Sequence, residues 1–493
     1  MRLRLSGHGY RYAVEQIMLA MFPGELPDYT ESGFESCEEP SACVRIGYGE
    51  AYATASTVLR TGGGVYRGRA RVGRAALTDA PERDRLLQSA IKRSFYKAAV
   101  AAVGAKPVWG SLTGIRPARV VAGMLKRGAS ERGAERSLRE VYGVSPERAA
   151  LCMDAARQAA AVGSGLPERA VMLYIGIPFC PSRCAYCSFV SHSVEKSAGL
   201  IGPFLGALRT ELAATAELAR ALGLTAVAVY VGGGTPTTLT ARQLDDLLGD
   251  AVSLFSLSEA REFTVEAGRP DTITPEKLAV MQKRGVTRVS VNPQSMSDAV
   301  LDAIGRRHTA DDTVRAYEDA RAAGFENINM DVIAGLPSDT PSGFAATVER
   351  ILALRPENVT VHTLSLKKGS RITLDGTSVP DGGAVSDMLG GAAAALRTAG
   401  YSPYYLYRQK FTSGGFENTG WSLPGSAGIY NVCMMEELRT VLACGGGGVT
   451  KLVDAATGRI ERIFNPKYPY EYVDRIERII EKKTKIEVFF HGI

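Results

Sequence analysis

Residues 177–189 read IPFCPSRCAYCSF and place three cysteines, at positions 180, 184 and 187, in a chain of 493 residues with eight cysteines in all. The stretch begins at the end of the apolar run VMLYIGI, residues 171–177, which has the length and composition of a buried strand. The cysteines are therefore predicted to lie on a tight loop directly after a strand. In a reducing compartment, closely spaced thiols are typical of metal binding or catalysis rather than of disulfides.

Two metal centres are compatible with the C-x3-C-x2-C spacing. Three thiolates can hold three irons of a [4Fe–4S] cluster and leave the fourth iron without a protein ligand. An open coordination position distinguishes a reactive metal centre from a closed structural one. The alternative is a structural zinc ion held by Cys180, Cys184 and Cys187, with His192 as the fourth ligand. The spacing by itself leaves both centres open.

The cysteine loop belongs to a series of short apolar runs that alternate with amphipathic segments. The six strand candidates read VMLYIGI, AVAVYVGG, EFTVEAG, RVSVNPQ, NINMDVIAGLP and NVTVHTLSL, and helices are predicted at 239–255, 275–284, 312–323 and 341–354. Alternation of this kind predicts a parallel sheet covered by helices. We predict an α/β fold built on an incomplete (β/α)6 TIM-like barrel, with its functional residues at the C-terminal ends of the strands.

Changes of pattern along the chain predict three domains. Residues 1–165 mix strand-like and helical segments, so we predict an N-terminal mixed α/β domain that ends near the linker-like run GSGLPERA. Residues 166–366 form the predicted partial barrel. Beyond Lys367 the pattern breaks into the aromatic stretch YSPYYLYRQK and the glycine-rich stretch VLACGGGGVTK. We predict that residues 367–493 form a C-terminal cap on the substrate side.

The composition is that of a globular enzyme. Hydrophobic residues make up 45% and charged residues 22% of the chain, and the formal net charge is +6. Lys and Arg are spread along the chain rather than gathered into one run, which argues against a dedicated nucleic-acid binder and weakly favours an anionic substrate. No apolar run has the length of a signal-peptide core or of a membrane span, so we expect a cytoplasmic protein.

A glycine-rich turn follows the second predicted strand. The stretch GGGTP, Gly232–Pro236, allows the backbone to approach a ligand closely and offers N–H groups to a carboxylate. Together with the three cysteines and Tyr186, this turn resembles the radical S-adenosylmethionine (SAM) superfamily over roughly residues 170–365. The resemblance implies a [4Fe–4S] cluster whose open iron binds the amino and carboxylate groups of SAM. It also implies that the reduced cluster cleaves SAM and releases a 5′-deoxyadenosyl radical.

Further motifs resemble one branch of this superfamily, the oxygen-independent coproporphyrinogen III dehydrogenases (oxidases). The motifs are YIGIPFC, GGGTPT, TVEAG, NPQS, GRRHT and NMDVIAGLP. The resemblance implies that Cys180, Cys184 and Cys187 ligate the cluster. The SAM contacts that it implies are Tyr174, Tyr186, Gly233, Gly234, Thr235, Glu266, Gln294, Arg306 and Asp331. A carboxylate at a strand end suits ribose hydroxyls, and a guanidinium suits the carboxylate of the methionine part.

The flanking sequences resemble the HemZ-like subgroup of these dehydrogenases. VWGSLTGIRP precedes the predicted barrel, and YNVCMMEELRTVLACGGGGVTK follows it. The resemblance implies oxidative decarboxylation of coproporphyrinogen III to protoporphyrinogen IX in anaerobic porphyrin and heme biosynthesis, in which two propionates become vinyl groups. It further implies a tetrapyrrole substrate and an electron donor such as flavodoxin or ferredoxin.

Two other sets of residues have both a functional and a structural interpretation. An aromatic and cationic wall for a tetrapyrrole with propionate groups is predicted from Tyr404, Tyr405, Tyr407, Arg408 and Lys410. Tyrosines at a domain junction are also common packing residues. His308 and His362 are candidates for a proton donor or metal ligand, although a lone histidine is more often a hydrogen-bonded structural group.

Two departures limit the resemblance. Position 189 is Phe, where the dehydrogenases carry a further cysteine and the related heme chaperones carry Phe. Those chaperones have a His-Asn-x-x-Tyr-Trp signature, and the nearest stretch here, ENTGW at Glu417–Trp421, has no histidine in that place. The alternatives are therefore a heme-binding chaperone, or a radical SAM enzyme that modifies heme or RNA, although nucleic acid is not an expected partner.

Overall fold

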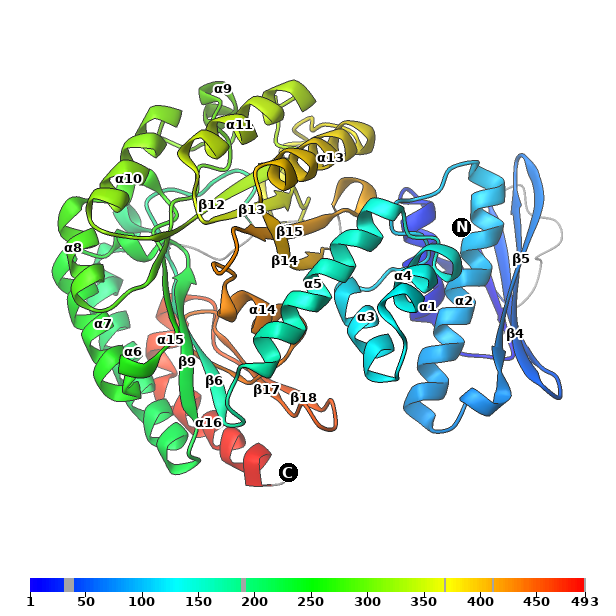
Figure 1. Ribbon diagram of the computed structural model, residues 1–493, viewed down its shortest axis with the longest axis horizontal. Helices are drawn as coiled ribbons and strands as arrows, with labels where there is room; N and C mark the ends of the chain where they lie inside the picture. Colours follow the sequence, from blue (N-terminus) through cyan, green and yellow to red (C-terminus); the bar gives the residue numbers. More distant parts are fainter. Residues whose placement is uncertain (31–39, 188–191, 368, 410–411, 492–493) are drawn as a thin grey trace. The chain divides into compact units, whose positions relative to one another are not determined.

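The computed structural model describes residues 1–30, 40–187, 192–367, 369–409 and 412–491. Phe189 and Lys410 lie outside these residues. The chain divides into two compact units, Met1–Met153 and Asp154–Ile493 (Figure 1). The division into three domains with boundaries at 165 and 366 stays a prediction.

The first unit is a five-stranded sheet with two helices on one face. Its strands are β1 (Arg2–Ser6), β2 (Asp28–Tyr29), β3 (Ser41–Tyr48), β4 (Tyr52–Thr61) and β5 (Gly64–Gly73), in the spatial order β2-β1-β3-β4-β5. β1 runs parallel to β2 and β3, whereas β4 runs antiparallel to both β3 and β5. The covering helices are α1 (Arg11–Met21) and α2 (Ala80–Val103). Figure 1 shows α2 lying along β4 and β5.

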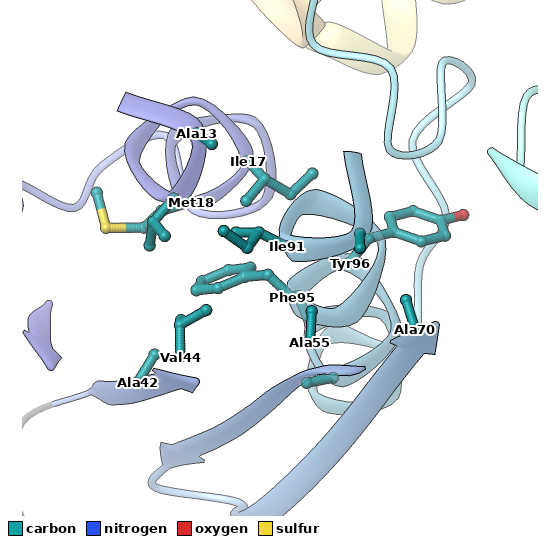
Figure 2. Packing of buried hydrophobic residues seen from close by; sticks show 14 of the residues in the cluster. Ala13, Ile17, Met18, Ala42, Val44, Ala55, Ala70, Ile91, Phe95 and Tyr96 are labelled. Atoms are coloured by element: carbon teal, nitrogen blue, oxygen red, sulfur yellow. The ribbon is translucent and has the colours of Figure 1, made fainter. Parts of the chain in front are cut away.

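Period-two alternation in the strands builds the core of this unit. In β3, Ala42 and Val44 are buried, and the residues between them face the other side of the sheet. Figure 2 shows Ile17 of α1 and Ile91 and Phe95 of α2 gathered over these two side chains. Full burial of a Val, Ile or Phe side chain contributes about 1.5–3 kcal/mol. This apolar layer therefore holds both helices on the same face of the sheet.

Helices complete the first unit and lead into the second. They are α3 (Pro117–Lys126), α4 (Glu131–Arg136), a π-helical segment at Ser137–Val141, and α5 (Pro146–Ser164).

The second unit contains an 11-stranded sheet with seven consecutive parallel strands, of which six belong to the predicted barrel. The six strands are β6 (Ala170–Ile177), β9 (Thr225–Gly233), β10 (Glu262–Glu266), β11 (Arg288–Ser290), β12 (Asn327–Ala334) and β13 (Asn358–Thr363). They pair in chain order, each parallel to the next. In the described part of the chain the sheet is open, with β14 (Ser402–Arg408) and β18 (Ile460–Phe464) as its end strands. The predicted α/β fold with an incomplete barrel is confirmed.

Helices connect the parallel strands and cover their outer side (Figure 1). They are α6 (Val194–Ala221), α7 (Ala241–Phe255), α8 (Pro275–Lys283), α9 (Asp298–Ala303), α10 (Ala310–Ala322) and α11 (Pro341–Leu354). Thr240 and Thr309 start α7 and α10 with capping boxes, which satisfy the first N–H groups of each helix. Among the helices of the described residues, none combines the length and apolar character that crossing a membrane requires.

Residues after Lys367 add strands to both ends of this sheet. β15 (Glu417–Ser422) pairs antiparallel with β13, and β14 pairs with β15. At the other end β16 (Val441–Gly445) pairs parallel with β6 and is followed by β17 (Val449–Val453) and β18. The helices of this segment are α12 (Arg371–Leu374), α13 (Gly382–Thr398), α14 (Ile429–Glu436), α15 (Pro469–Asp474) and α16 (Ile476–His491). The segment predicted as a cap is thus continuous with the barrel sheet.

A fully buried ion pair fastens α16 to the sheet and to α6. Nζ of Lys483 lies 2.9 Å from Oε1 of Glu211, and neither side chain has exposed surface. Lys483 also donates to the carbonyl oxygen of Ala443 on β16 at 2.5 Å. The N–H of Gly445 donates to Glu211 at 2.7 Å. Because removal of one partner of a buried pair destabilises a protein by about 3–5 kcal/mol, this cluster ties three distant segments together.

Candidate active site

A cavity of about 390 Å³ lies at the C-terminal ends of the parallel strands. All strands of a parallel barrel end at the same edge, so residues far apart in the sequence converge there. The lining contains Cys180, Cys184, Cys187, Tyr186, Gly233, Gly234, Thr235, Glu266, Gln294, Arg306 and Asp331. The remaining predicted SAM contact, Tyr174, lies behind the wall, with its ring centroid 6.4 Å from that of the lining residue Tyr230.

The cysteine loop is anchored along its length. Cys180 ends the short strand β7 (Phe179–Cys180), which pairs with β8 (His192–Ser193). In the middle of the loop, the N–H of Ala185 donates to the carbonyl oxygen of Ile304 at 2.9 Å. The loop is therefore held by backbone hydrogen bonds from two sides, and all three thiols lie on the cavity wall.

The glycine turn after β9 packs directly against this loop. A Cβ atom at Gly234 would lie 2.4 Å from the carbonyl oxygen of Phe179, and Gly233 has φ +106°, which L side chains rarely adopt. The N–H groups of Gly234 and Thr235 donate to the carbonyl oxygens of Ile177 and Phe179, both at 2.7 Å. The predicted close approach of the turn is therefore made to the cysteine loop. These two N–H groups bind protein carbonyls, in contrast to the predicted role as donors to a ligand.

Two buried guanidinium groups lie against the cysteine loop. Arg269, just after β10, donates to Oγ of Ser182 at 3.2 Å and to Sγ of Cys184 at 3.6 Å. Arg306 donates to the hydroxyl of Tyr186 at 3.2 Å. Although burial disfavours the charge of Arg306, Coulomb interactions with Tyr186 and Cys184 hold its pKa above the usual range. The two guanidinium groups therefore place positive charge beside the cysteine loop.

Glu266 ends β10 and presents a carboxyl group that is half protonated near neutral pH. Burial raises the pKa of Glu266 to about 7, although the hydroxyl of Tyr230, which donates to Oε1, acts in the opposite direction. The rings of Tyr174 and Tyr430 stack on Tyr230, with centroids at 6.4 and 4.6 Å. The stacked rings therefore border this carboxyl on one side, while it also lines the cavity, where it can accept hydrogen bonds from hydroxyls or face a cation.

Asp331 and His362 form an ion pair at the ends of β12 and β13. Nε2 of His362 lies 3.6 Å from Oδ2 of Asp331, and Asn329 donates to Oδ1 at 2.8 Å. Burial works against both charges, but each partner outweighs it: Asp331 holds the pKa of His362 above its usual value, and His362 holds the pKa of Asp331 below its usual value. The pair lies on the cavity wall, and each partner favours the charged form of the other.

His308 has a different environment. Burial, followed by the charges of Arg306 and Arg269, lowers the pKa of His308 to about 4, so its ring is neutral. Nδ1 lies 4.0 Å from Oδ1 of Asp271. Within the described residues neither ring nitrogen makes a hydrogen bond. His308 is packed behind the two arginines rather than placed on the cavity lining.

Two buried amide oxygens on the lining have no hydrogen-bond partner. Across the described ranges, neither Oδ1 of Asn292 nor Oε1 of Gln294 accepts a hydrogen bond. Gln294 has φ +69°, a strained value for a residue other than glycine. Its backbone is fixed there by hydrogen bonds to Asp331 and Ile333 at 2.9 and 3.0 Å. An unsatisfied buried acceptor costs about 1–3 kcal/mol, and a ligand with N–H or O–H donors would offset it.

The aromatic part of the predicted tetrapyrrole wall lines the same cavity. The residues are Tyr404, Tyr405 and Tyr407, all on β14. The ring centroids of the first two lie 4.8 Å apart, and those of the last two 6.4 Å apart. Arg408 is not on the lining, and its Nε donates to the carbonyl oxygen of Gly415 at 2.9 Å. Lys367 is an exposed cation on this part of the lining.

The lining residues that the sequence predictions did not single out include Tyr230, Arg269 and Asn292. Each lies in or just after a strand that was predicted correctly, and Arg269 directly follows the quoted motif TVEAG. A polar residue at the C-terminal end of a barrel strand was the available signal.

The chain is similar in sequence and in structure to known proteins. Residues 174–351 match the radical SAM superfamily. The chain is 42% identical over 382 residues to the oxygen-independent coproporphyrinogen-III oxidase-like protein HemZ of Bacillus subtilis, which covers 76% of each chain. It is 36% identical over 193 residues to the heme chaperone HemW of the same organism, covering 39% of this chain and 49% of that one. The solved structure of coproporphyrinogen III oxidase (HemN) from Escherichia coli, a radical SAM enzyme, has a TM-score of 0.52 at 23% identity over 66% of this chain and 72% of that one. This last likeness concerns the fold alone.

Proposed function

The chain belongs to the radical SAM superfamily and, within it, to the oxygen-independent coproporphyrinogen-III oxidase-like proteins, and on this premise we propose that it converts coproporphyrinogen III to protoporphyrinogen IX. Removal of a hydrogen atom from the β-carbon of a propionate, then loss of CO2 and of one electron to an acceptor, leaves a vinyl group. Two propionates react in this way. The observation that supports the proposal is that the three cysteines and the tyrosine wall with Lys367 border one cavity.

The side chains around the cavity fit a [4Fe–4S] cluster and SAM, the cofactors of the superfamily. Cys180, Cys184 and Cys187 would hold the cluster, with Arg269 beside the second thiol. The unpartnered oxygens of Asn292 and Gln294, with the carboxyl of Glu266, suit the hydroxyl and amino groups of SAM. When bound, the two cofactors supply the radical that removes the hydrogen atom.

The protein itself binds and orients SAM and the substrate and shields the reactive intermediates from water. Arg306 suits the carboxylate of SAM, and Asp331, kept ionised by His362, suits its hydroxyl or amino groups. The faces of Tyr405 and Tyr407 suit a flat macrocycle, and the buried ring of Tyr405 keeps water away from reactive intermediates. We further propose a flavodoxin or ferredoxin as the electron donor, action in the cytoplasm, and a place in anaerobic heme biosynthesis.

The test is anaerobic turnover of the reconstituted protein with reductant, SAM and coproporphyrinogen III, in which porphyrin products, CO2 and 5′-deoxyadenosine are followed together. We expect protoporphyrinogen with two 5′-deoxyadenosine molecules for each product. Cys184→Ala should abolish the formation of protoporphyrinogen and of 5′-deoxyadenosine. Cys43→Ala, on β3 of the first unit, should leave the formation of both products unchanged. Cleavage of SAM without a vinyl product would contradict the substrate and leave the radical chemistry standing.

A heme chaperone is the second candidate, supported by the similarity to HemW. Where the chaperone signature would lie, β15 carries Asn418, whose Oδ1 accepts the N–H of Thr363 at 2.9 Å. Its Oδ1 is thus bound to the sheet, and the side chain is buried on the cavity lining. Titration of the reconstituted protein with heme, monitored by absorbance, separates the two functions. Stoichiometric heme binding without decarboxylation would favour the chaperone.

A further inference from the structure

We propose that the uncovered face of the sheet in the first unit binds single-stranded RNA through its phosphate backbone. The binding surface, called here the arginine face, is formed by Arg4 of β1, Arg45 of β3, and Arg67, Arg69 and Arg71 of β5, all of them exposed. The inference concerns Met1–Met153 alone and is independent of the function proposed for the second unit.

The alternation of residues in β5 separates the arginines from the helices. The stretch RGRAR places Gly68 and Ala70 on the buried side and three arginines on the exposed side. A Cβ atom at Gly68 would lie 1.9 Å from the carbonyl oxygen of Ser94, so α2 is pressed against the buried side. The arginine face is therefore the side of the sheet that α1 and α2 leave open.

Strand register brings the arginines into adjacent rows. Arg69 pairs with Ser56 of β4, which in turn pairs with Arg45 of β3. Successive arginines of β5 are about 6.8 Å apart along the strand, and neighbouring strands are about 4.8 Å apart. A surface of this kind presents repeated positive charges at regular intervals, which matches the repeated charges of a nucleic-acid backbone.

The positive charge of this face is not neutralised by neighbouring carboxylates. Within the described part of the chain, none of the five arginines makes an ion pair. The strand positions of this face carry one acid, Asp28 at the edge, which lies 3.9 Å from Nε of Arg2. Two further cations, Arg93 and Lys97 of α2, donate to carbonyl oxygens at the edge of β5. Binding of a polyanion to such a surface releases counterions, and this release contributes to the affinity.

The remaining residues of the face favour single-stranded RNA over a membrane or a duplex. Thr54 and Ser56 place hydroxyl groups beside the arginines, where they can meet ribose hydroxyls. Tyr52 is 51% exposed, and the guanidinium carbon of Arg71 lies 5.9 Å from its ring centroid. An exposed aromatic ring next to cations is a platform for base stacking. The distribution of Lys and Arg along the sequence did not reveal this surface, because the arginines come together on one face of the sheet only after folding.

The test measures fluorescence anisotropy of a labelled single-stranded RNA of mixed sequence, about 20 nucleotides long, with the full chain. We expect binding that weakens between about 50 and 200 mM KCl. The combined variant Arg67→Gln, Arg69→Gln, Arg71→Gln should lower the affinity about tenfold or more and reduce the salt slope by about 2.

The matched control removes the same charge from another part of the unit. It combines Arg132→Gln, Arg136→Gln and Arg139→Gln, at exposed positions of α4 and the π-helical segment, and should keep the affinity within about twofold. If the β5 variant does not fold, as judged by circular dichroism, Arg69→Glu alone replaces it. Equal loss of affinity in the two variants would overturn the proposal. Equal affinity for DNA of the same sequence, or binding to vesicles rich in phosphatidylserine without binding to RNA, would also overturn it.

Discussion

The guanidinium group of Arg269 donates to Sγ of Cys184 at 3.6 Å, which joins the end of β10 to the middle of the cysteine loop. Arg269 is only 3% exposed, and its second partner in the loop is Ser182. We predict that Arg269→Gln retains the fold but loses iron and sulfide from the reconstituted protein about tenfold faster, because hydrogen bonds of charged groups contribute about 1.5–3 kcal/mol. Arg307→Gln, which changes an exposed arginine paired with Glu195, is the control. Equal retention in both variants would contradict the role given to Arg269.

Gly234 leaves no room for a side chain. Its Cβ would meet the backbone of Phe179 at 2.4 Å, and backbone cannot move aside as a flexible side chain can. We therefore expect Gly234→Ala to lower the free energy of unfolding by about 1–3 kcal/mol and to reduce cluster content. Gly206→Ala in α6, where a Cβ has nothing within 4 Å, should be neutral or slightly stabilising. Urea unfolding and iron analysis check both, and a neutral Gly234→Ala would show that the turn can shift.

Glu266 makes stability depend on pH. Its pKa rises from 4.5 in the unfolded chain to about 7 in the folded protein. The stability that the protonated form contributes is complete below about 4.5 and is lost as the pH rises through about 7. Over that range the free energy of unfolding should fall by the order of 3 kcal/mol relative to Glu266→Gln. Urea unfolding of both proteins without cofactors at several pH values measures this, and parallel curves would contradict it.

The ion pair of Asp331 and His362 has its own pH window. His362 has a raised pKa, so its contribution to stability is complete below 6.5 and is lost as the pH rises through the folded value. Asp331 has a lowered pKa, so its contribution is present above 3.8 and is lost as the pH falls. His362→Gln should therefore destabilise the protein most between these two values and least in alkaline solution. The double variant with Asp331→Asn should remove this pH dependence. If His362→Gln lowers the free energy of unfolding by the same amount at every pH, His362 has a packing role only.

Substitution of Lys367 tests whether this part of the cavity binds the substrate. If the proposed function is right, this exposed cation pairs with a propionate, and Lys367→Met raises KM for coproporphyrinogen about tenfold. Cleavage of SAM in the absence of substrate should stay unchanged. Lys467→Met, at another exposed lysine, is the matched control. An unchanged KM in both variants would show that the propionates bind elsewhere.

Local patterns in the sequence were sufficient to predict the central strands and the cysteine loop. The six barrel strands are short segments rich in apolar residues with helices between them, and the spacing of the three cysteines depends on one loop only. The neighbours of that loop were not predictable in the same way. The contacts of Arg269 with Cys184, and the pairing of β16 with β6, depend on how distant segments meet. The arginine face likewise depends on the register of three strands.

The pairing of β6 with β16 also bears on how the protein is made. β6 leads into the cysteine loop, yet one of its two neighbouring strands consists of residues 441–445, and the buried partner of Glu211 is residue 483. A growing chain therefore carries an unpaired edge on β6 until most of the sequence has left the ribosome. Such an edge is prone to aggregation and invites chaperone binding. Iron and sulfide would then be inserted after translation, when the strand beside the thiols has both neighbours.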